Sequence, residues 1–313
     1  MNKVESPASP LIDGSTAAKE KGPSLLQEWK ALIKTGIVNS NLITTFAGFW
    51  LAVHFTGASF TANWDVFLLT MAGSALVIAG GCIINNWYDA DIDPVMSRTK
   101  TRPSVTGSIP RNRILMAGVS STALGHILLL LTTLEAAMIA FLGWFTYVVL
   151  YTVWSKRRYT LNTAIGSISG AVPPLIGWAA VDPGLHPIAY MLFLIMFIWQ
   201  TPHFLALAMK KTKEYKAAGV PMLPAVHGFA MTKRQIAIYV AFLLPLPFLM
   251  GELGPVFIVI ATLLNIGWLA VSFSGFVMKN DLKWANMIFI YSLNYLTILF
   301  LLMVGVTFEF PFG

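Results

Sequence analysis

The chain has 313 residues, of which 56% are hydrophobic and 11% are charged. Soluble domains have about 25% charged residues, so this composition excludes a soluble globular protein and predicts an integral membrane protein. The net charge of +7 does not indicate a nucleic-acid partner, because the basic residues are sorted along the chain as in a membrane protein. The only cysteine, Cys82, lies in an apolar stretch, which excludes a disulfide framework and a cysteine-based metal cluster.

The N-terminal segment is rich in Pro, Ser, Ala, Lys and Glu, and it lacks the apolar core of a secretory signal peptide. We expect residues 1–30 to form a disordered cytoplasmic tail and residues 31–313 to form one membrane domain. The acidic residues of the N-terminal segment are unusual for an organellar transit peptide. The sequence therefore favours a protein of the bacterial plasma membrane.

Nine apolar stretches approach the ~20 residues needed to cross a bilayer, which predicts an all-α membrane fold with nine transmembrane helices. They cover residues 36–55, 66–88, 114–134, 136–154, 162–181, 187–208, 236–252, 254–276 and 286–306. All 21 Lys and Arg residues fall in the N-terminal segment or in the connectors 89–113, 155–161, 209–235 and 277–285. The positive-inside rule then places the N-terminus in the cytoplasm and the C-terminus outside. We expect the functional site at the cytoplasmic side, where the connectors are longest.

An acidic stretch follows the second predicted span. Asn85, Asp89 and Asp93 are spaced four residues apart, so they share about 80° of one face if the helix continues. Carboxylates at the end of a membrane helix need compensation, for which Mg²⁺ is one candidate. The alternative is a solvated helix end that stops at Pro94.

Basic residues accompany this acidic stretch, both in the same connector and at the end of the fourth span. With one neighbouring tyrosine, they are Arg98, Lys100, Arg102, Tyr151, Lys156 and Arg157. Carboxylates beside Arg and Lys are typical of a site for a phosphorylated ligand bridged by Mg²⁺. The alternative is a set of positive-inside residues that anchor helix ends.

A second polar segment ends the sixth span. His203, Lys210 and Glu214 lie within about 40° of one helical face if the helix continues past the membrane, and they would then face the same cavity as the acidic stretch. The alternative is a snorkelling Lys with a Glu partner and an interfacial His. Within the spans, Asn41 is expected to face the bundle interior. His54 and His126 are candidate iron or porphyrin contacts, or else packing residues.

Several of these motifs resemble those of a known family. Asn85-x-x-x-Asp89-x-x-x-Asp93, Arg102-Pro103 and Tyr151-x-x-x-x-Lys156-Arg157 are similar to motifs of the UbiA-type intramembrane prenyltransferases. Residues 170–178, 199–204 and 214–224 resemble the branch of that family that forms haem O. The resemblance runs from about residue 34 to the C-terminus. It implies nine helices around a central cavity and two cytoplasmic acidic motifs that hold a prenyl diphosphate through Mg²⁺.

The resemblance also implies a reaction. The protein would transfer the farnesyl group of farnesyl diphosphate to a vinyl group of haem B in the lipid bilayer. Haem A synthase would then receive the product. It implies metal binding by Asp89, Asp93 and Glu214, with Asn85, Arg102 and Lys156 as further catalytic residues. The implied substrate-binding residues are Asn41, Arg98, Lys100, Tyr151, Arg157, His203, Lys210, Glu214 and Tyr215.

One departure from the family pattern concerns the second acidic motif. The region 210–214 reads Lys-Lys-Thr-Lys-Glu, so Glu214 is left to bind a second metal ion, while Lys210 and Lys213 are placed to bind diphosphate directly. Two other functions stay open from the sequence: a UbiA-type enzyme with a quinone-precursor or chlorin acceptor, and a small-molecule transporter. Against a transporter, the polar residues gather at one face and no inverted repeat is evident.

Overall fold

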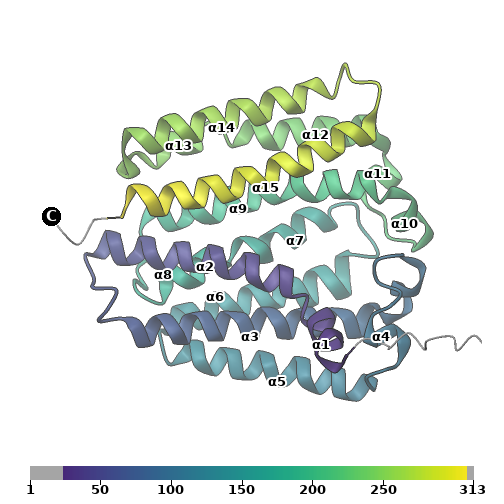
Figure 1. Ribbon diagram of the computed structural model, residues 1–313, viewed down its shortest axis with the longest axis horizontal. Coiled ribbons are helices and arrows are strands. Elements are labelled where there is room, and N and C mark those ends of the chain that lie inside the picture. Colours follow the sequence, from purple (N-terminus) through teal and green to yellow (C-terminus); the bar gives the residue numbers. More distant parts are fainter. Residues whose placement is uncertain (1–23, 309–313) are drawn as a thin grey trace, which may run out of the picture.

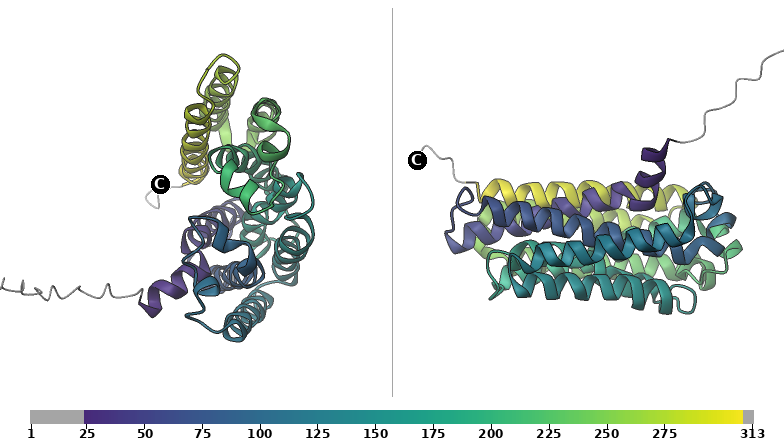
Figure 2. Two further views of the ribbon diagram at one scale, coloured as in Figure 1. Left: turned by 90° about the vertical axis from the view of Figure 1, so that its right-hand side faces the viewer. Right: turned by 90° about the horizontal axis from the view of Figure 1, so that it is seen from below.

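The structure, a computed structural model, describes residues 24–308 as a bundle of helices that run side by side (Figures 1 and 2). The α-helices are α1 (Leu25–Ile33), α2 (Thr35–Thr56), α3 (Trp64–Tyr88), α4 (Pro103–Thr106), α5 (Arg111–Leu130), α6 (Leu134–Phe145), α7 (Asn162–Ala171), α8 (Pro173–Ala179), α9 (Pro187–Lys210), α10 (Thr212–Ala217), α11 (Leu223–Val226), α12 (Gly228–Phe242), α13 (Leu246–Leu249), α14 (Gly254–Ser274) and α15 (Asp281–Val306). The segments η1 (Asp89–Asp91), η2 (Asp93–Val95) and η4 (Gly251–Leu253) are 3₁₀-helices, and η3 (Thr146–Ser155) is a π-helix.

Within the described residues, eight helical segments are long and apolar enough to cross a membrane. They coincide with eight of the nine predicted spans. The remaining predicted span, 162–181, forms two short helices, α7 and α8, that meet at Val172. The break occurs because Pro173 and Pro174 have no backbone N–H to donate and clash with the preceding turn.

The helix α1 was not expected from the sequence. A capping box at Ser24 closes its first turn, and Leu32 is completely buried against apolar residues of α3 and α5. The expectation that residues 1–30 form a disordered tail is therefore wrong for residues 25–30, and residues 1–23 lie outside the described residues.

Glycine residues allow the helices to approach closely, as is common in membrane bundles. A Cβ atom on Gly80 of α3 would lie 2.7 Å from the Gly118 carbonyl oxygen of α5. In α2, a Cβ atom on Gly48 would lie 2.0 Å from the carbonyl oxygen of Pro174 in α8. The broken α7–α8 segment is thus held against α2 by direct backbone contact.

The short helices α1, α4, α10 and α11 gather at one end of the bundle, and the C-terminal end of α15 lies at the other end (Figure 1). The connectors that carry the Lys and Arg residues are at the same end as these short helices. We call this the basic end. The long helices therefore position the predicted polar motifs at one face of the membrane domain.

Replacing Gly48 by Ala should destabilise the fold, because the new Cβ would clash with backbone that has no room to move. Overpacking of this kind costs about 1–3 kcal/mol, so the melting temperature in detergent should fall by several degrees. Gly36→Ala, in the same helix, is the matched control because its Cβ would meet nothing within 4 Å. Equal melting temperatures for the two variants would contradict this packing.

Candidate active site

The acidic stretch lies at the basic end, but it does not continue the helix. α3 ends at Tyr88, and Asp89 and Asp93 stand in the successive 3₁₀ turns η1 and η2. The prediction that Asn85, Asp89 and Asp93 share one helical face is therefore wrong. Pro94 stands in the first turn of η2, where it cannot donate the backbone hydrogen bond that a continuing α-helix would need. Asn85 still contacts Asp89, since its Nδ2 donates a hydrogen bond of 2.9 Å to Asp89 Oδ2.

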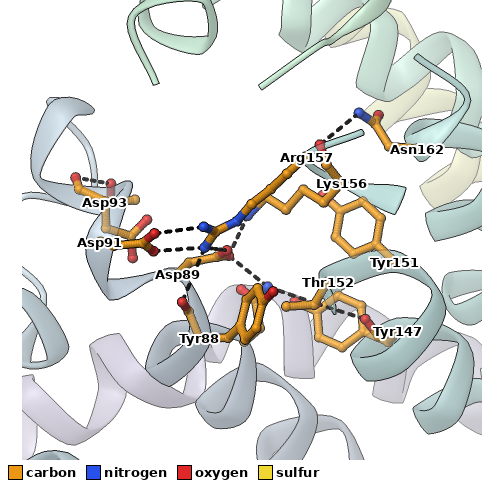
Figure 3. Close-up of polar contacts among 12 residues, drawn as sticks. Tyr88, Asp89, Asp91, Asp93, Tyr147, Tyr151, Thr152, Lys156, Arg157 and Asn162 are labelled. Carbon is orange, nitrogen blue, oxygen red and sulfur yellow. Dashed lines mark hydrogen bonds and ion pairs between the residues drawn. The ribbon is translucent and has the colours of Figure 1, made fainter. Parts of the chain in front are cut away.

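The two carboxylates are buried and each is paired with basic side chains. Asp89 is 0% exposed and Asp93 is 1% exposed. The Lys156 ammonium contacts Asp89 Oδ2, and Arg157 Nη2 lies 3.4 Å from Asp89 Oδ1 (Figure 3). Arg102 Nη1 lies 2.6 Å from Asp93 Oδ2. Buried carboxylates require such partners, because an unpaired buried charge is strongly destabilising.

Arg157 joins this cluster to the neighbouring Asp91. Its two terminal nitrogens donate to the two Asp91 carboxylate oxygens at 2.7 Å and 2.8 Å. Its guanidinium also lies over the Tyr88 ring, 4.8 Å from the centroid. The hydrogen bonds that Arg157 donates to Asp91 raise the pKa of Arg157 above its ordinary value. Arg157 therefore stays charged and rigidly oriented at the cluster.

The π-helix η3 explains the spacing between Tyr151 and Lys156. Residues five apart in an α-helix lie about 140° apart and do not share a face. In a π-helix the residues five apart are hydrogen-bonded neighbours, and here the Lys156 N–H donates to the Tyr151 carbonyl at 2.9 Å. Tyr151 also stacks on Tyr147, with ring centroids 5.8 Å apart. η3 thus presents two aromatic rings and Lys156 beside Asp89 (Figure 3).

Lys34 is a functional candidate that the sequence reasoning missed. It lies between α1 and α2, and its ammonium donates to Asn85 Oδ1 at 2.5 Å and to the Tyr147 hydroxyl at 3.4 Å. Although part of its side chain is accessible, the protein packed around the ammonium lowers the pKa of Lys34 to about 8. The charges of Arg102 and Lys156 act in the same direction. A Lys directly before an apolar span was the one available signal, and it is also what the positive-inside rule predicts.

The second polar segment is divided between two helices. α9 ends at Lys210 and α10 begins at Thr212, so His203, Lys210 and Glu214 do not share one continuous helical face. The Glu214 carboxylate accepts hydrogen bonds from Lys211 Nζ at 2.8 Å and from Ser97 Oγ at 3.1 Å. The Lys211 hydrogen bond lowers the pKa of Glu214.

The position of Glu214 bears on the expected metal site. Among residues 24–308, no group of three or more His, Cys, Asp or Glu side chains is arranged to hold a metal ion. The structure therefore does not bring Glu214 together with Asp89 and Asp93.

The two long connectors nevertheless contact each other at the basic end. Besides the hydrogen bond from Ser97 to Glu214, Ile92 and Tyr215 pack on a buried apolar cluster formed by Ala208, Val220 and Met222. Burial raises the pKa of Tyr215, while the nearby charges of Arg98 and Lys156 partly oppose this rise. Tyr215 is thus within electrostatic range of Arg98 and Lys156.

His203 and Lys210 face α15. His203 Nδ1 lies 2.8 Å from Ser292 Oγ, and its ring stacks between Trp199 and Phe289, with ring centroids at 4.9 Å and 4.8 Å. The Ser292 hydroxyl donates to the Phe289 carbonyl, so His203 Nδ1 is the donor to Ser292 and Nε2 is left as an acceptor. Lys210 Nζ donates to Asn286 Oδ1 at 2.6 Å and lies 4.6 Å from the centroid of the Phe289 ring.

The structure does not join the other expected residues to this cluster by hydrogen bonds. Arg98 and Lys100 are exposed, and neither forms an ion pair with another described residue. Asn41 Nδ2 donates to the Ile37 carbonyl within its own helix. His126 Nδ1 hydrogen-bonds to the Thr122 carbonyl of α5, and its ring borders an open apolar groove on the outer face of α5 and α6.

Comparisons with known proteins agree with this architecture. The model of the UbiA prenyltransferase family matches residues 41–293. A protein of Oceanobacillus iheyensis named protoheme IX farnesyltransferase is 63% identical, over 97% of this chain and 98% of that protein. A solved structure of digeranylgeranylglyceryl phosphate synthase has a TM-score of 0.71 at 19% identity, covering 90% of this chain and 98% of that chain. A UbiA homologue from Archaeoglobus fulgidus, solved with GPP and Mg²⁺, has a TM-score of 0.62 at 14% identity. The match covers 88% of this chain and 99% of that chain.

Replacing Lys156 by Met should destabilise the protein by about 3 kcal/mol, because the completely buried Asp89 would lose its principal counter-charge. Adding Asp89→Asn to this variant should restore most of the lost stability, as measured by thermal unfolding. Lys211→Met is the matched control, since it breaks a partly exposed ion pair with Glu214 and should cost less than about 1 kcal/mol. Equal losses for Lys156→Met and Lys211→Met would contradict the assigned burial of Asp89.

Proposed function

The chain belongs to the UbiA prenyltransferase family, and we propose that it is a haem O synthase. It transfers the farnesyl group of farnesyl diphosphate to a vinyl group of haem B, with addition of water and release of diphosphate. The observation that carries this proposal is the pair of buried carboxylates, Asp89 and Asp93, held among basic side chains at one end of an apolar bundle. The choice of acceptor is supported by the 63% identity to a protein named protoheme IX farnesyltransferase.

Mg²⁺ fits the donor atoms of the cluster. The carboxylates of Asp89 and Asp93 and the amide oxygen of Asn85 are hard oxygen ligands of the kind that Mg²⁺ prefers. When bound there, the ion would neutralise negative charge on the diphosphate as it leaves. Glu214 is the candidate for a second ion, and it would have to exchange its contacts with Lys211 and Ser97 for that role.

The basic side chains hold and stabilise the leaving group. Arg102, Lys156 and Arg157 carry fixed positive charges at the cluster, and Arg98 and Lys100 lie in the adjoining connector. As the bond between farnesyl C1 and the diphosphate oxygen breaks, its electron pair goes to the diphosphate. Preorganised charges that meet this developing negative charge lower the barrier electrostatically.

The carbon framework then reacts in an apolar environment. The vinyl π electrons form the new carbon–carbon bond to farnesyl C1, and water adds to the resulting cation beside the porphyrin and releases a proton. The stacked rings of Tyr147 and Tyr151 lie next to Asp89, where their π faces favour positive charge on the farnesyl chain. The apolar helices exclude water from the first cation.

We assign the acceptor to the wall formed by α9 and α15. His203 Nε2 offers a lone pair in an imidazole whose orientation is fixed by Ser292, Trp199 and Phe289, which suits an axial ligand of haem iron. Lys210 follows seven residues later in α9, about 10 Å along the helix axis. We assign its ammonium to a propionate of the same porphyrin.

The proposed orientation follows the charge distribution. The connectors with the Lys and Arg residues lie at the basic end, which we assign to the cytoplasmic face of the plasma membrane. Counting α7 and α8 together as one broken span gives nine spans, with the C-terminus outside. The product is apolar and stays in the bilayer, where haem A synthase would receive it.

Incubation of the detergent-solubilised protein with farnesyl diphosphate, haem B and Mg²⁺ should yield hydroxyethylfarnesyl haem, detected by mass spectrometry. Asp89→Asn should reduce turnover by at least about 100-fold, because it removes a charge at the reacting centre. Asp182→Asn, which changes a carboxylate at the opposite end of the bundle, is the control and should retain activity. Farnesylation of a quinone precursor or chlorin, with haem B left unchanged, would reject the acceptor.

His203→Ala should raise the KM for haem B by about tenfold or more while leaving the KM for farnesyl diphosphate unchanged, because it removes the proposed iron ligand. The Soret band of haem bound to the variant should also differ from that of the wild type. His54→Ala, near the end of α2 that is away from the basic end, is the matched control and should change neither quantity. If the His203 variant kept the wild-type Soret band and the wild-type KM for haem B, His203 would have only a packing role.

A further inference from the structure

Lys34 differs from the other basic residues of the polar cluster in its partners. Arg102, Lys156 and Arg157 each form an ion pair with a buried or neighbouring carboxylate. Lys34 forms no ion pair with any residue in the range 24–308, and its hydrogen-bond partners are the neutral side chains of Asn85 and Tyr147. A partly buried ammonium whose hydrogen-bond partners are all neutral lacks the paired carboxylate that the other basic residues have.

The fold keeps Lys34 in this position at a conformational cost. Its backbone is left-handed, with φ 57° and ψ 58°. Residues other than Gly, Asn and Asp seldom adopt this conformation. Next to it, Leu32 is completely buried, and the Leu32 carbonyl accepts a hydrogen bond of 2.8 Å from Asn86 Nδ2. The end of α1 is thus attached to α3, one residue after Asn85. Strained residues that are held so firmly concentrate at functional sites.

The charges at the cluster identify the kind of ligand that Lys34 would take. The acidic residues Asp89, Asp91 and Asp93 are matched by Arg102, Lys156 and Arg157 through the ion pairs described above. Lys34 is a fourth basic residue beside these three pairs, and its charge has no acidic counterpart among them. Because its side chain is partly accessible, an anionic ligand that enters the cluster can reach it, and a phosphate oxygen satisfies an ammonium as a carboxylate would.

We propose that Lys34 is a substrate-binding residue that contacts the diphosphate of the prenyl donor, delivered to the site by the α1–α2 junction. This inference rests on the proposed function and adds a residue from a part of the chain that no motif covers. Asn85 and Tyr147 hold the ammonium at the edge of the cluster. A purely structural role, in which Lys34 only orients Asn85, acts through the bound Mg²⁺ and predicts no change in the affinity for diphosphate groups when Mg²⁺ is absent.

The test compares binding of the non-reactive farnesyl thiolodiphosphate to full-length variants in detergent by calorimetry, both with Mg²⁺ and without it. Lys34→Asn and Lys34→Gly remove the ammonium and suit the left-handed backbone, so both should fold with melting temperatures close to the wild type. Both should bind the analogue at least about tenfold more weakly, and Lys34→Arg should recover part of the affinity. The Soret band of bound haem B should not change in any variant.

Lys30→Asn is the matched control, because Lys30 is an exposed basic residue on α1, and its affinity for the analogue should equal that of the wild type. Affinities of both folded Lys34 variants within twofold of the wild type would overturn the role of Lys34 while leaving the proposed function intact. Absence of binding by the wild-type protein would instead overturn the proposed function, and this inference with it.

Discussion

Two carboxylates buried at the end of an apolar bundle impose the constraint on which the site depends. Asp89 and Asp93 can remain charged there only if cations accompany them. Separate parts of the chain meet this demand: the end of η3 supplies Lys156 and Arg157, and the connector before α4 supplies Arg102. The need for charge balance thus determines how the helix ends and connectors come together at the basic end.

The same pairing suits a ligand that carries both signs of charge. A diphosphate with a divalent cation can exchange partners with the cluster, because the cation takes the carboxylates and the phosphate oxygens take the guanidinium and ammonium groups. Neither state then leaves an uncompensated charge in a region of low dielectric constant. A solvated helix end, the alternative reading of the acidic stretch, does not account for carboxylates that are 0% and 1% exposed.

The sequence predicts eight of the described spans and the gathering of the polar motifs at one end of the bundle, because both depend on composition and charge along the chain. It predicts the local geometry less well. A periodicity of 3.6 residues placed Asn85, Asp89 and Asp93 on one face, yet α3 ends at Tyr88 and Asp93 pairs with Arg102. The π-helical turn that brings Lys156 to Asp89 has no periodic signature, since it depends on packing between helices. The role of Lys34 was likewise hidden, because its partners are far away in the sequence.

Residues 210–214 stand where the family has its second acidic motif, but their side chains do not join the cluster around Asp89. Glu214 links its connector to the first one through Ser97, and Ile92 packs beneath this link on the cluster around Val220. Lys210 instead faces α15 beside Phe289. A large planar acceptor with negatively charged propionates needs a cation and aromatic surface on its own wall, and a second run of aspartates there would repel it. The reduced acidity at residues 210–214 is therefore consistent with an anionic porphyrin as the acceptor, with the diphosphate held mainly by the cluster around Asp89.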